Sequence, residues 1–253
     1  ETATLRKVAQ KVPYNYYVLW TLGRRARIAK DYEAAEEFLR GAAAVLGTTA
    51  DGELASLYEE RGDRPKAIEA YKSLLAAAPN GLSAANIKAK ICELLTKENR
   101  IEEALQYGRE AAESYSGSAL RAYADALIAA GRNEEGLDYY RKLAHRYPDW
   151  SREYIVKLYE AKTPRERIFS EAKAIAEEHR GQPLQDEIVG QFIVHGDFDA
   201  AMKLLNGPLA FKKTADRSRY LGIIALLDNR ADEAARHFNA AIDGKYLREH
   251  KYS

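Results

Sequence analysis

The stretch GELASLYEERGDRPKAIEAYKSLLAAAP, residues 52–79, decides the fold of this chain. Its first half places Leu54, Leu57 and Tyr58 three and four residues apart, on one face of a helix. Gly62-Asp63 then interrupts the pattern, as turn residues do at the end of a helix. The first half therefore predicts an amphipathic helix followed by a tight turn.

The second half of the stretch predicts another helix. Pro65 stands in its first turn, where the missing N–H of proline is tolerated. Ala67, Tyr71 and Leu74 follow at helical spacing, and Pro79 ends the pattern. Together the two halves predict a helical hairpin.

This hairpin pattern recurs along the chain. The residues that align with Ala67 are separated by steps of 32, 37, 32, 32, 33 and 33 residues. They are Ala35, Ala67, Ala104, Gly136, Ile168, Ala201 and Ala234. Spacing this regular indicates a repeat array, in which each unit buries its apolar face only by stacking on its neighbours.

Two segments depart from the regular spacing. The 37-residue step contains NGLS at residues 80–83, which we expect to lengthen the loop between the second and third hairpins. The sequence NGP at residues 206–208 is expected to end a helix early and to leave residues 209–213 as a loop or an extra turn.

The composition argues against several functional classes. With 39 basic and 38 acidic side chains the net charge is +1, which is not typical of a general polyanion binder. No apolar run approaches the roughly 20 residues that cross a bilayer. Cys92 is the single cysteine, so we expect neither an intramolecular disulfide nor a cysteine zinc site. A lone cysteine is compatible with a reducing compartment such as the cytoplasm.

The start of the chain leaves the compartment open. It begins with Glu1 instead of methionine, and residues 1–14 resemble the second half of a repeat. We interpret the sequence as part of a longer array or as a processed chain. Any export signal would then lie outside it.

The sequence contains no recognisable catalytic pattern. Its five histidines are not paired four residues apart, and it has no HExxH, GxSxG or GxxxxGK motif. His195 precedes Gly196-Asp197 and is interpreted as a turn residue, and Cys92 as a buried structural thiol. We therefore expect no enzyme activity, no cofactor and no metal site.

The pattern resembles the tetratricopeptide repeat (TPR), a 34-residue helix–turn–helix with small residues where its helices cross. The residues that match best are Leu54-Ala55, Tyr58, Gly62, Ala67, Tyr71, Leu74 and Pro79. Gly136 and Ile168 depart from the usual alanine. The resemblance implies an all-α fold, a right-handed α-solenoid over residues 1–253. Its units would be a partial repeat at 1–14 and repeats at about 16–49, 50–80, 84–116, 117–148, 149–180, 182–213 and 215–247.

The resemblance also implies where a partner binds. In TPR arrays the unpacked stripe of each first helix lines a concave groove. The residues expected there are Trp20, Arg24, Arg27, Arg121, Asp125, Ile128, Glu153, Lys157, Glu160, Asp186, Ile193, Arg219, Ile223 and Leu226. This surface would be cationic at its amino end, mixed in the middle and apolar at its carboxyl end.

Each end also has a purely structural interpretation. The arginines at the amino end can form a solvated helix face instead of a patch that binds anions or carboxylates. The apolar residues at the carboxyl end can be covered by the tail or by a following helix instead of forming an open groove.

Three functional hypotheses follow from the sequence. The leading one is a non-enzymatic scaffold that binds a peptide or helix of a partner protein in the groove. The alternative is a regulatory or targeting segment of a larger enzyme whose catalytic domain lies outside this chain. RNA binding by a helical repeat is the third, and the near-neutral charge argues against it.

The residues argue against one TPR subtype, which binds the carboxylate of chaperone tails with Lys and Asn side chains. Trp20 and Arg24 occupy the first two clamp positions, and Glu53, Asn86 and Lys90 occupy the next three. We predict no binding of Hsp70- or Hsp90-type C-terminal peptides. A titration with such an acidic peptide tests this, and low-micromolar affinity would contradict it.

Overall fold

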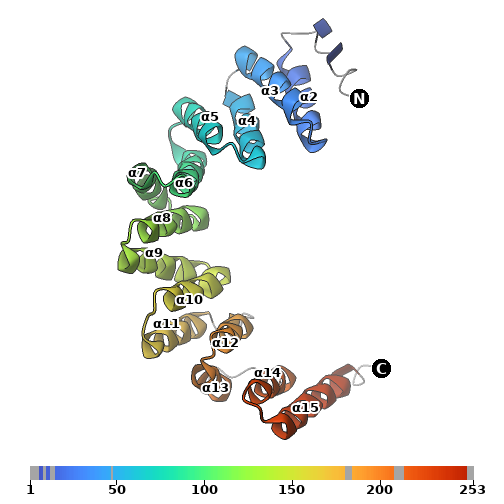
Figure 1. Cartoon of the computed structure of the whole chain (residues 1–253), viewed down its shortest axis with the longest axis vertical. Helices are drawn as coiled ribbons and strands as arrows, with labels where there is room; N and C mark the ends of the chain where they lie inside the picture. The colour runs from blue at the N-terminus through green and yellow to red at the C-terminus, as the bar shows by residue number, and fades with distance from the viewer. Residues whose placement is uncertain are drawn as a thin grey trace. The chain divides into compact units, whose positions relative to one another are not determined.

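The computed structural model describes residues 6–7, 10–11, 15–46, 48–179, 184–207 and 214–249, and no strand occurs in these ranges. The chain divides into two compact units, Glu1–Tyr139 and Tyr140–Ser253 (Figure 1). The all-α fold expected from the sequence is confirmed. Most of the expected partial repeat at 1–14 lies outside the described residues, and the seven repeat boundaries stay a prediction.

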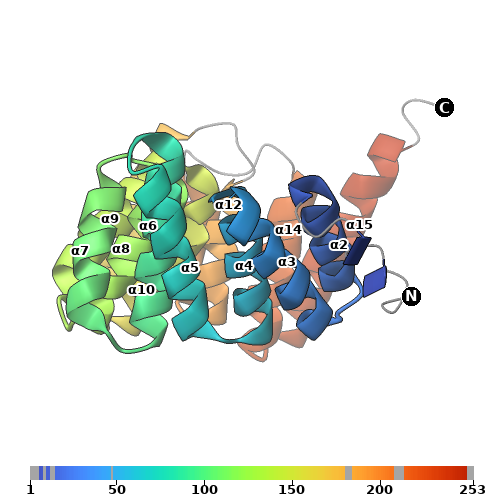
Figure 2. The ribbon, with the colours of Figure 1, turned by 90° about the horizontal axis from the view of Figure 1, so that it is seen from above.

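The first unit is built of consecutive helical hairpins (Figures 1 and 2). Within hairpins α2 packs on α3, α4 on α5 and α6 on α7, while α3 packs on α4 and α5 on α6 of the following hairpin. First helices also meet directly, α2 with α4 and α6 with α8. The helices are α2 (Tyr16–Ile28), α3 (Tyr32–Leu46), α4 (Thr48–Arg61), α5 (Arg64–Ala77), α6 (Gly81–Lys97), α7 (Ile101–Ala112), α8 (Gly117–Ala129) and the first half of α9 (Asn133–Arg146).

The second unit has the same kind of packing. α10 packs on α11 and on α12, α12 on α13, and α14 on α15. Besides the rest of α9, its elements are η1 (Pro148–Trp150), α10 (Ser151–Glu160), α11 (Arg165–Glu178), α12 (Leu184–Val194), α13 (Phe198–Asn206), α14 (Thr214–Leu227) and α15 (Ala231–Glu249).

A residue in the left-handed backbone conformation joins the two helices of each hairpin. These turn residues have φ between 56° and 77° and are Lys30, Gly62, Asn99, Gly131, Lys162, Gly196 and Asn229. The N–H that follows each of them donates to the carbonyl five residues earlier, as from Asp63 to Tyr58 at 2.9 Å. Such bonds satisfy carbonyl groups that the end of the first helix leaves without a partner. The turns predicted at Gly62-Asp63 and Gly196-Asp197 are confirmed.

The small residues of the repeat lie where the helices cross. Ala35, Ala67 and Ala201 are fully buried, with 0% of their surface exposed. At Gly136 an added Cβ would lie 2.6 Å from Cγ1 of Ile128 and 2.9 Å from a backbone oxygen. Even one methyl group does not fit there, which explains why glycine replaces the usual alanine.

The expectation for residues 80–83 was wrong. They do not lengthen the loop, because α6 starts at Gly81 and has 17 residues, whereas α2 and α8 have 13. Asn80 is the N-cap of α6, so the Asn-Gly pair begins a helix here instead of forming a loop. As expected, α13 ends early, at Asn206 after nine residues, and residues 209–213 lie outside the described ranges.

Two glycines in helix interiors predict opposite effects of the same substitution. Gly136→Ala should destabilise the protein by roughly 1–3 kcal/mol, because the new Cβ overpacks against Ile128. Gly190→Ala in α12 should stabilise it by about 0.5–1 kcal/mol, because alanine is the better helix former. No described atom lies within 4 Å of a Cβ built on Gly190. Urea unfolding of both variants checks the pair, and shifts of equal sign would contradict it.

The burial of Cys92 predicts an inert thiol. Its Sγ lies 3.3 Å from the carbonyl oxygen of Ala122, and burial raises the pKa of Cys92 to about 12. Because the thiolate is the reactive form, the folded protein should not react with DTNB at pH 8. Unfolding in denaturant restores an ordinary thiol pKa and should release one equivalent of colour. Rapid labelling of the folded protein would show that the site opens.

Candidate protein-binding surface

The left-handed turn residues place the first helices in a common register. The positions three, six and ten residues before each turn residue are four and three apart, so they share one helical face. Counting back from Lys30, Gly131, Gly196 and Asn229, these positions form what we call the first-helix stripe. It holds Trp20, Arg24 and Arg27 in α2; Arg121, Asp125 and Ile128 in α8; Asp186, Gly190 and Ile193 in α12; and Arg219, Ile223 and Leu226 in α14.

In α10 the structure corrects the alignment. The second helix of the other hairpins starts two residues after the turn residue, but α11 starts three residues after Lys162. If the first helix is aligned by its distance from the crossing residue Ile168, each of its stripe positions is therefore assigned one residue too late in the sequence. The stripe of α10 holds Arg152, Val156 and Tyr159, and the expected Glu153, Lys157 and Glu160 each lie one residue further along.

At the amino end of the stripe, the cationic residues are paired. The guanidinium of Arg24 lies 4.8 Å from the ring centroid of Trp20 and 3.2 Å from Glu53. Arg27 lies 3.0 Å from Glu53 and also pairs with Glu60. Both carboxylates come from α4, so the positive charge of α2 is balanced by its neighbour. The sequence interpretation missed both glutamates, although the separation of 33 residues between Arg27 and Glu60 is one repeat.

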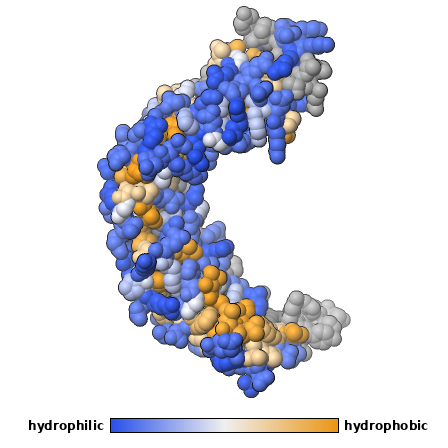
Figure 3. Space-filling view, in the orientation of Figure 1, coloured by the Kyte–Doolittle hydropathy of each residue, from blue (hydrophilic) through white to orange (hydrophobic). Residues whose placement is uncertain are grey.

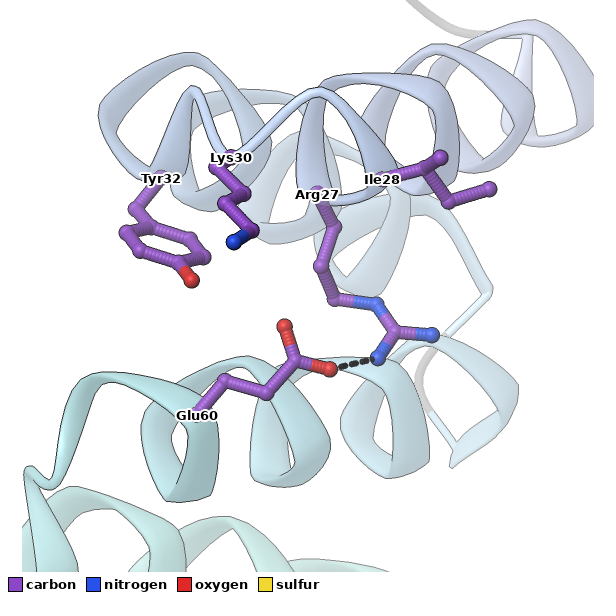
Figure 4. A pocket seen from close by; sticks show the side chains of 5 residues that line it. All are labelled: Arg27, Ile28, Lys30, Tyr32 and Glu60. Atoms are coloured by element: carbon purple, nitrogen blue, oxygen red, sulfur yellow. Dashed lines mark hydrogen bonds and ion pairs between the residues drawn. The ribbon is translucent and has the colours of Figure 1, made fainter.

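A pocket of about 400 Å³ adjoins these pairs. Its lining residues are Arg27, Ile28, Lys30, Tyr32 and Glu60 (Figure 4). In the close-up, the side chains of Lys30 and Tyr32 extend from the first hairpin toward Glu60 on α4, while Ile28 points aside. Ligand sites are usually lined mainly by hydrophobic and aromatic side chains, whereas three of the five residues here are charged.

Ion pairs also join neighbouring first helices in the rest of the first unit. Glu59 of α4 lies 3.3 Å from Lys90 of α6, and Glu93 of α6 lies 3.7 Å from Arg121 of α8. Asp125 is half-buried beside them. The mixed middle expected from the sequence is therefore a series of opposite charges.

Several side chains of α10, the first helix of the fifth hairpin, contact other residues of this chain. Glu153 accepts a hydrogen bond from Tyr140 at 3.3 Å, and Lys157 pairs with Glu160 at 2.9 Å. The Tyr159 ring stacks on His195 with 4.1 Å between centroids. This contact gives His195 a packing role in the turn.

Tyr159 also links α10 to the next hairpin through its hydroxyl. The hydroxyl donates to Asp197 at 3.1 Å, and Asp197 in turn accepts from the backbone of Ala200 as the N-cap of α13. Burial, with Asp197 beside it, raises the pKa of Tyr159. The hydroxyl therefore stays protonated and holds the two hairpins together.

The carboxyl end of the stripe exposes apolar side chains. Leu226 is 55% exposed, and Ile193 and Ile223 are half-buried. Val194 and Leu227, which the sequence interpretation missed, are 75% and 54% exposed. Apolar residues gather over α12 and α14 in the space-filling view (Figure 3). The sequence signal for the two missed residues was their position next to a stripe residue at the end of a first helix.

The two helices that carry these residues are neighbours. The Tyr220 hydroxyl of α14 donates to the backbone oxygen of Asp186 in α12 at 3.2 Å. Arg219 is exposed, and its guanidinium lies 4.8 Å from the ring centroid of Tyr220. The surface of α12 and α14 thus combines a cation with exposed apolar side chains. We call it the α12/α14 face.

Two other kinds of feature are absent from the described ranges. No group of three or more His, Cys, Asp or Glu residues there is arranged to hold a metal ion. No helix in those ranges is long and apolar enough to cross a membrane.

Several solved structures have a similar fold. A tetratricopeptide repeat protein from Parabacteroides merdae shares 18% identity, with 92% of this chain and 94% of that chain covered and a TM-score of 0.54. YrrB, described as a TPR protein with an unusual peptide-binding site, shares 14%, with 78% and 100% covered and a TM-score of 0.52. The human IFIT1 dimer with m7Gppp-AAAA shares 16%, with 94% and 57% covered and a TM-score of 0.56. At these identities the likeness shows the fold alone.

Sequence comparison identifies repeats over part of the chain. No curated protein matches the chain. Two tetratricopeptide repeat models do match it, at residues 53–119 and 118–149. The first match begins inside α4, and the second ends just after α9. These matches identify residues 53–149 as tetratricopeptide repeats, and the solved structures show that the described chain as a whole has the same kind of fold.

Proposed function

We propose that this TPR protein is a non-enzymatic scaffold that binds a peptide or helix of a partner protein on its α12/α14 face. TPR repeats are in general protein-interaction modules, and the proposal concerns which surface is used. One observation carries it: Val194, Leu226 and Leu227 expose more than half of their surface on neighbouring first helices. Soluble proteins commonly use apolar patches of this kind as binding sites.

The exposed residues contribute little to the core of the solenoid. The core residues of the same helices, such as Phe192 and Ala225, have at most 1% of their surface exposed. Each Å² of apolar surface that a partner removes from water contributes about 25 cal/mol before the costs of association. A segment that covers these side chains therefore gains from burial without disturbing the hairpins.

The first unit is the weaker candidate for the same role. A ligand of Arg24 or Arg27 has to compete with Glu53 and Glu60, which already neutralise them. The side chains of Arg27 and Glu53 are only 21% and 19% exposed, so a ligand that separates them has to compensate partly desolvated charges on both residues. The peptide-binding site reported for YrrB supports peptide binding by this fold, without indicating which residues of this chain take part.

Leu226→Asp should weaken partner binding at least tenfold, because it places a charge in the contact. Ile242→Asp is the matched control, since Ile242 is 64% exposed but lies on α15, the second helix of its hairpin. A photo-crosslinking residue at position 227 first captures and identifies the partner. Titration of the purified partner then gives the Kd for each variant.

The outcome separates the two faces of the hairpin. Retained binding by Ile242→Asp together with loss in Leu226→Asp supports the proposal. Undiminished binding by Leu226→Asp, or equal loss in both variants, would remove the α12/α14 face as the binding surface.

A further inference from the structure

Gly190 is a helix-interior glycine that the packing of the described chain does not require. It lies in α12, six residues before the turn residue Gly196, and so belongs to the first-helix stripe. A Cβ built on it meets no described atom within 4 Å. Glycine weakens a helix interior, so its presence here does not stabilise the hairpin.

Four other glycines in first and second helices are different. At Gly23, Gly108, Gly136 and Gly222 an added Cβ would lie 2.5–2.8 Å from a neighbouring side chain. These four glycines let two helices approach closely. Gly190 instead leaves an open place on the surface of α12.

The surroundings of this open place are apolar. On α12 it is followed along the stripe by Ile193, which is half-buried, and then by the exposed Val194. On the neighbouring α14, the residue at the same register position is Ile223, which is also half-buried. The missing side chain of Gly190 therefore makes a notch in the α12/α14 face.

The same face has a cation at one end. Arg219 lies seven residues before Leu226 on the stripe of α14, a rise of about 10 Å along a helix. Its guanidinium contacts the ring of Tyr220, and no ion pair joins it to a described residue, although the carboxylate of Asp186 acts on the hydroxyl of the same tyrosine. Arg219 differs in this from Arg24 and Arg27, whose charges are matched by glutamates.

We propose that the notch at Gly190 receives an apolar side chain of the partner segment, and that Arg219 pairs with an acidic residue of the same segment. This inference rests on the proposed function and specifies its ligand: an amphipathic segment that carries an apolar anchor for the notch and an acidic residue for Arg219. The notch gives shape selectivity, and the charge pair sets the direction in which the segment lies.

The test uses the whole chain and a displayed library of random 16-residue peptides. Peptides are selected for binding, and the most enriched one is synthesised with blocked ends and titrated. The variants are Gly190→Leu, Arg219→Glu and Leu226→Asp, with Ile242→Asp as the control on α15. Thermal unfolding is measured for each one.

The expected result has three parts. Gly190→Leu binds at least tenfold more weakly while its Tm stays at or above that of the parent, because the added side chain fills the notch and not the core. Arg219→Glu also binds the peptide at least tenfold more weakly. A peptide whose acidic residue is replaced by lysine recovers affinity for Arg219→Glu, which a merely structural role of Arg219 would not produce.

The other outcomes distinguish this inference from the function on which it rests. If Leu226→Asp loses peptide binding while Gly190→Leu and Arg219→Glu bind as the parent does, the proposed roles of the notch and of the charge pair are wrong. The α12/α14 face then remains the binding surface. Failure to select any peptide whose binding depends on Leu226 counts against both this inference and the proposed function. A lower Tm in Gly190→Leu would show that the glycine serves packing after all.

Discussion

The fold depends on a short turn of nearly constant length between the two helices of each hairpin. A left-handed residue follows the first helix, and the next N–H returns to a carbonyl five residues earlier. Three residues separate the two helices in five of the seven described hairpins, so the second helix starts in a defined register relative to the first. Glycine or asparagine tolerates this conformation best, yet Lys30 and Lys162 adopt it as well. Packing within the hairpin therefore stabilises the left-handed conformation at these lysines, and the turn in return fixes the register of the two helices.

The register set by the turn decides which side chains must be small. Gly136 cannot carry a methyl group because Ile128 and the backbone of α8 lie against it. Ile168 is fully buried at the aligned crossing of the fifth hairpin, where the turn is one residue longer. Turn length and crossing residue thus change together, and a sequence alignment on the crossing alone misplaces the first helix. That is the physical reason why Glu153, Lys157 and Glu160 were assigned to the stripe of α10.

Local sequence patterns predicted the hairpins, their turns and their buried residues, since each depends on neighbours within one repeat. They did not predict the role of Glu53 and Glu60, because ion pairing depends on the reach of side chains from one hairpin to the next. The helix start at Asn80 was also missed, since the same Asn-Gly pair is compatible with a loop and with a helix cap. The stripe residues outside α10 could be located from spacing, whereas their partners and exposure required coordinates.

The two units use the same stripe differently. In the first unit opposite charges on neighbouring first helices satisfy each other, and such pairs contribute little to stability when exposed. In the second unit the stripe ends in leucine and isoleucine side chains that have no such partner within the core. Stability alone favours neither arrangement, because stripe residues lie outside the packed interior. Gly190 and Gly136 differ in the same way: a Cβ on Gly136 would collide with Ile128, whereas a Cβ on Gly190 would meet no described atom within 4 Å, so helix packing does not account for Gly190.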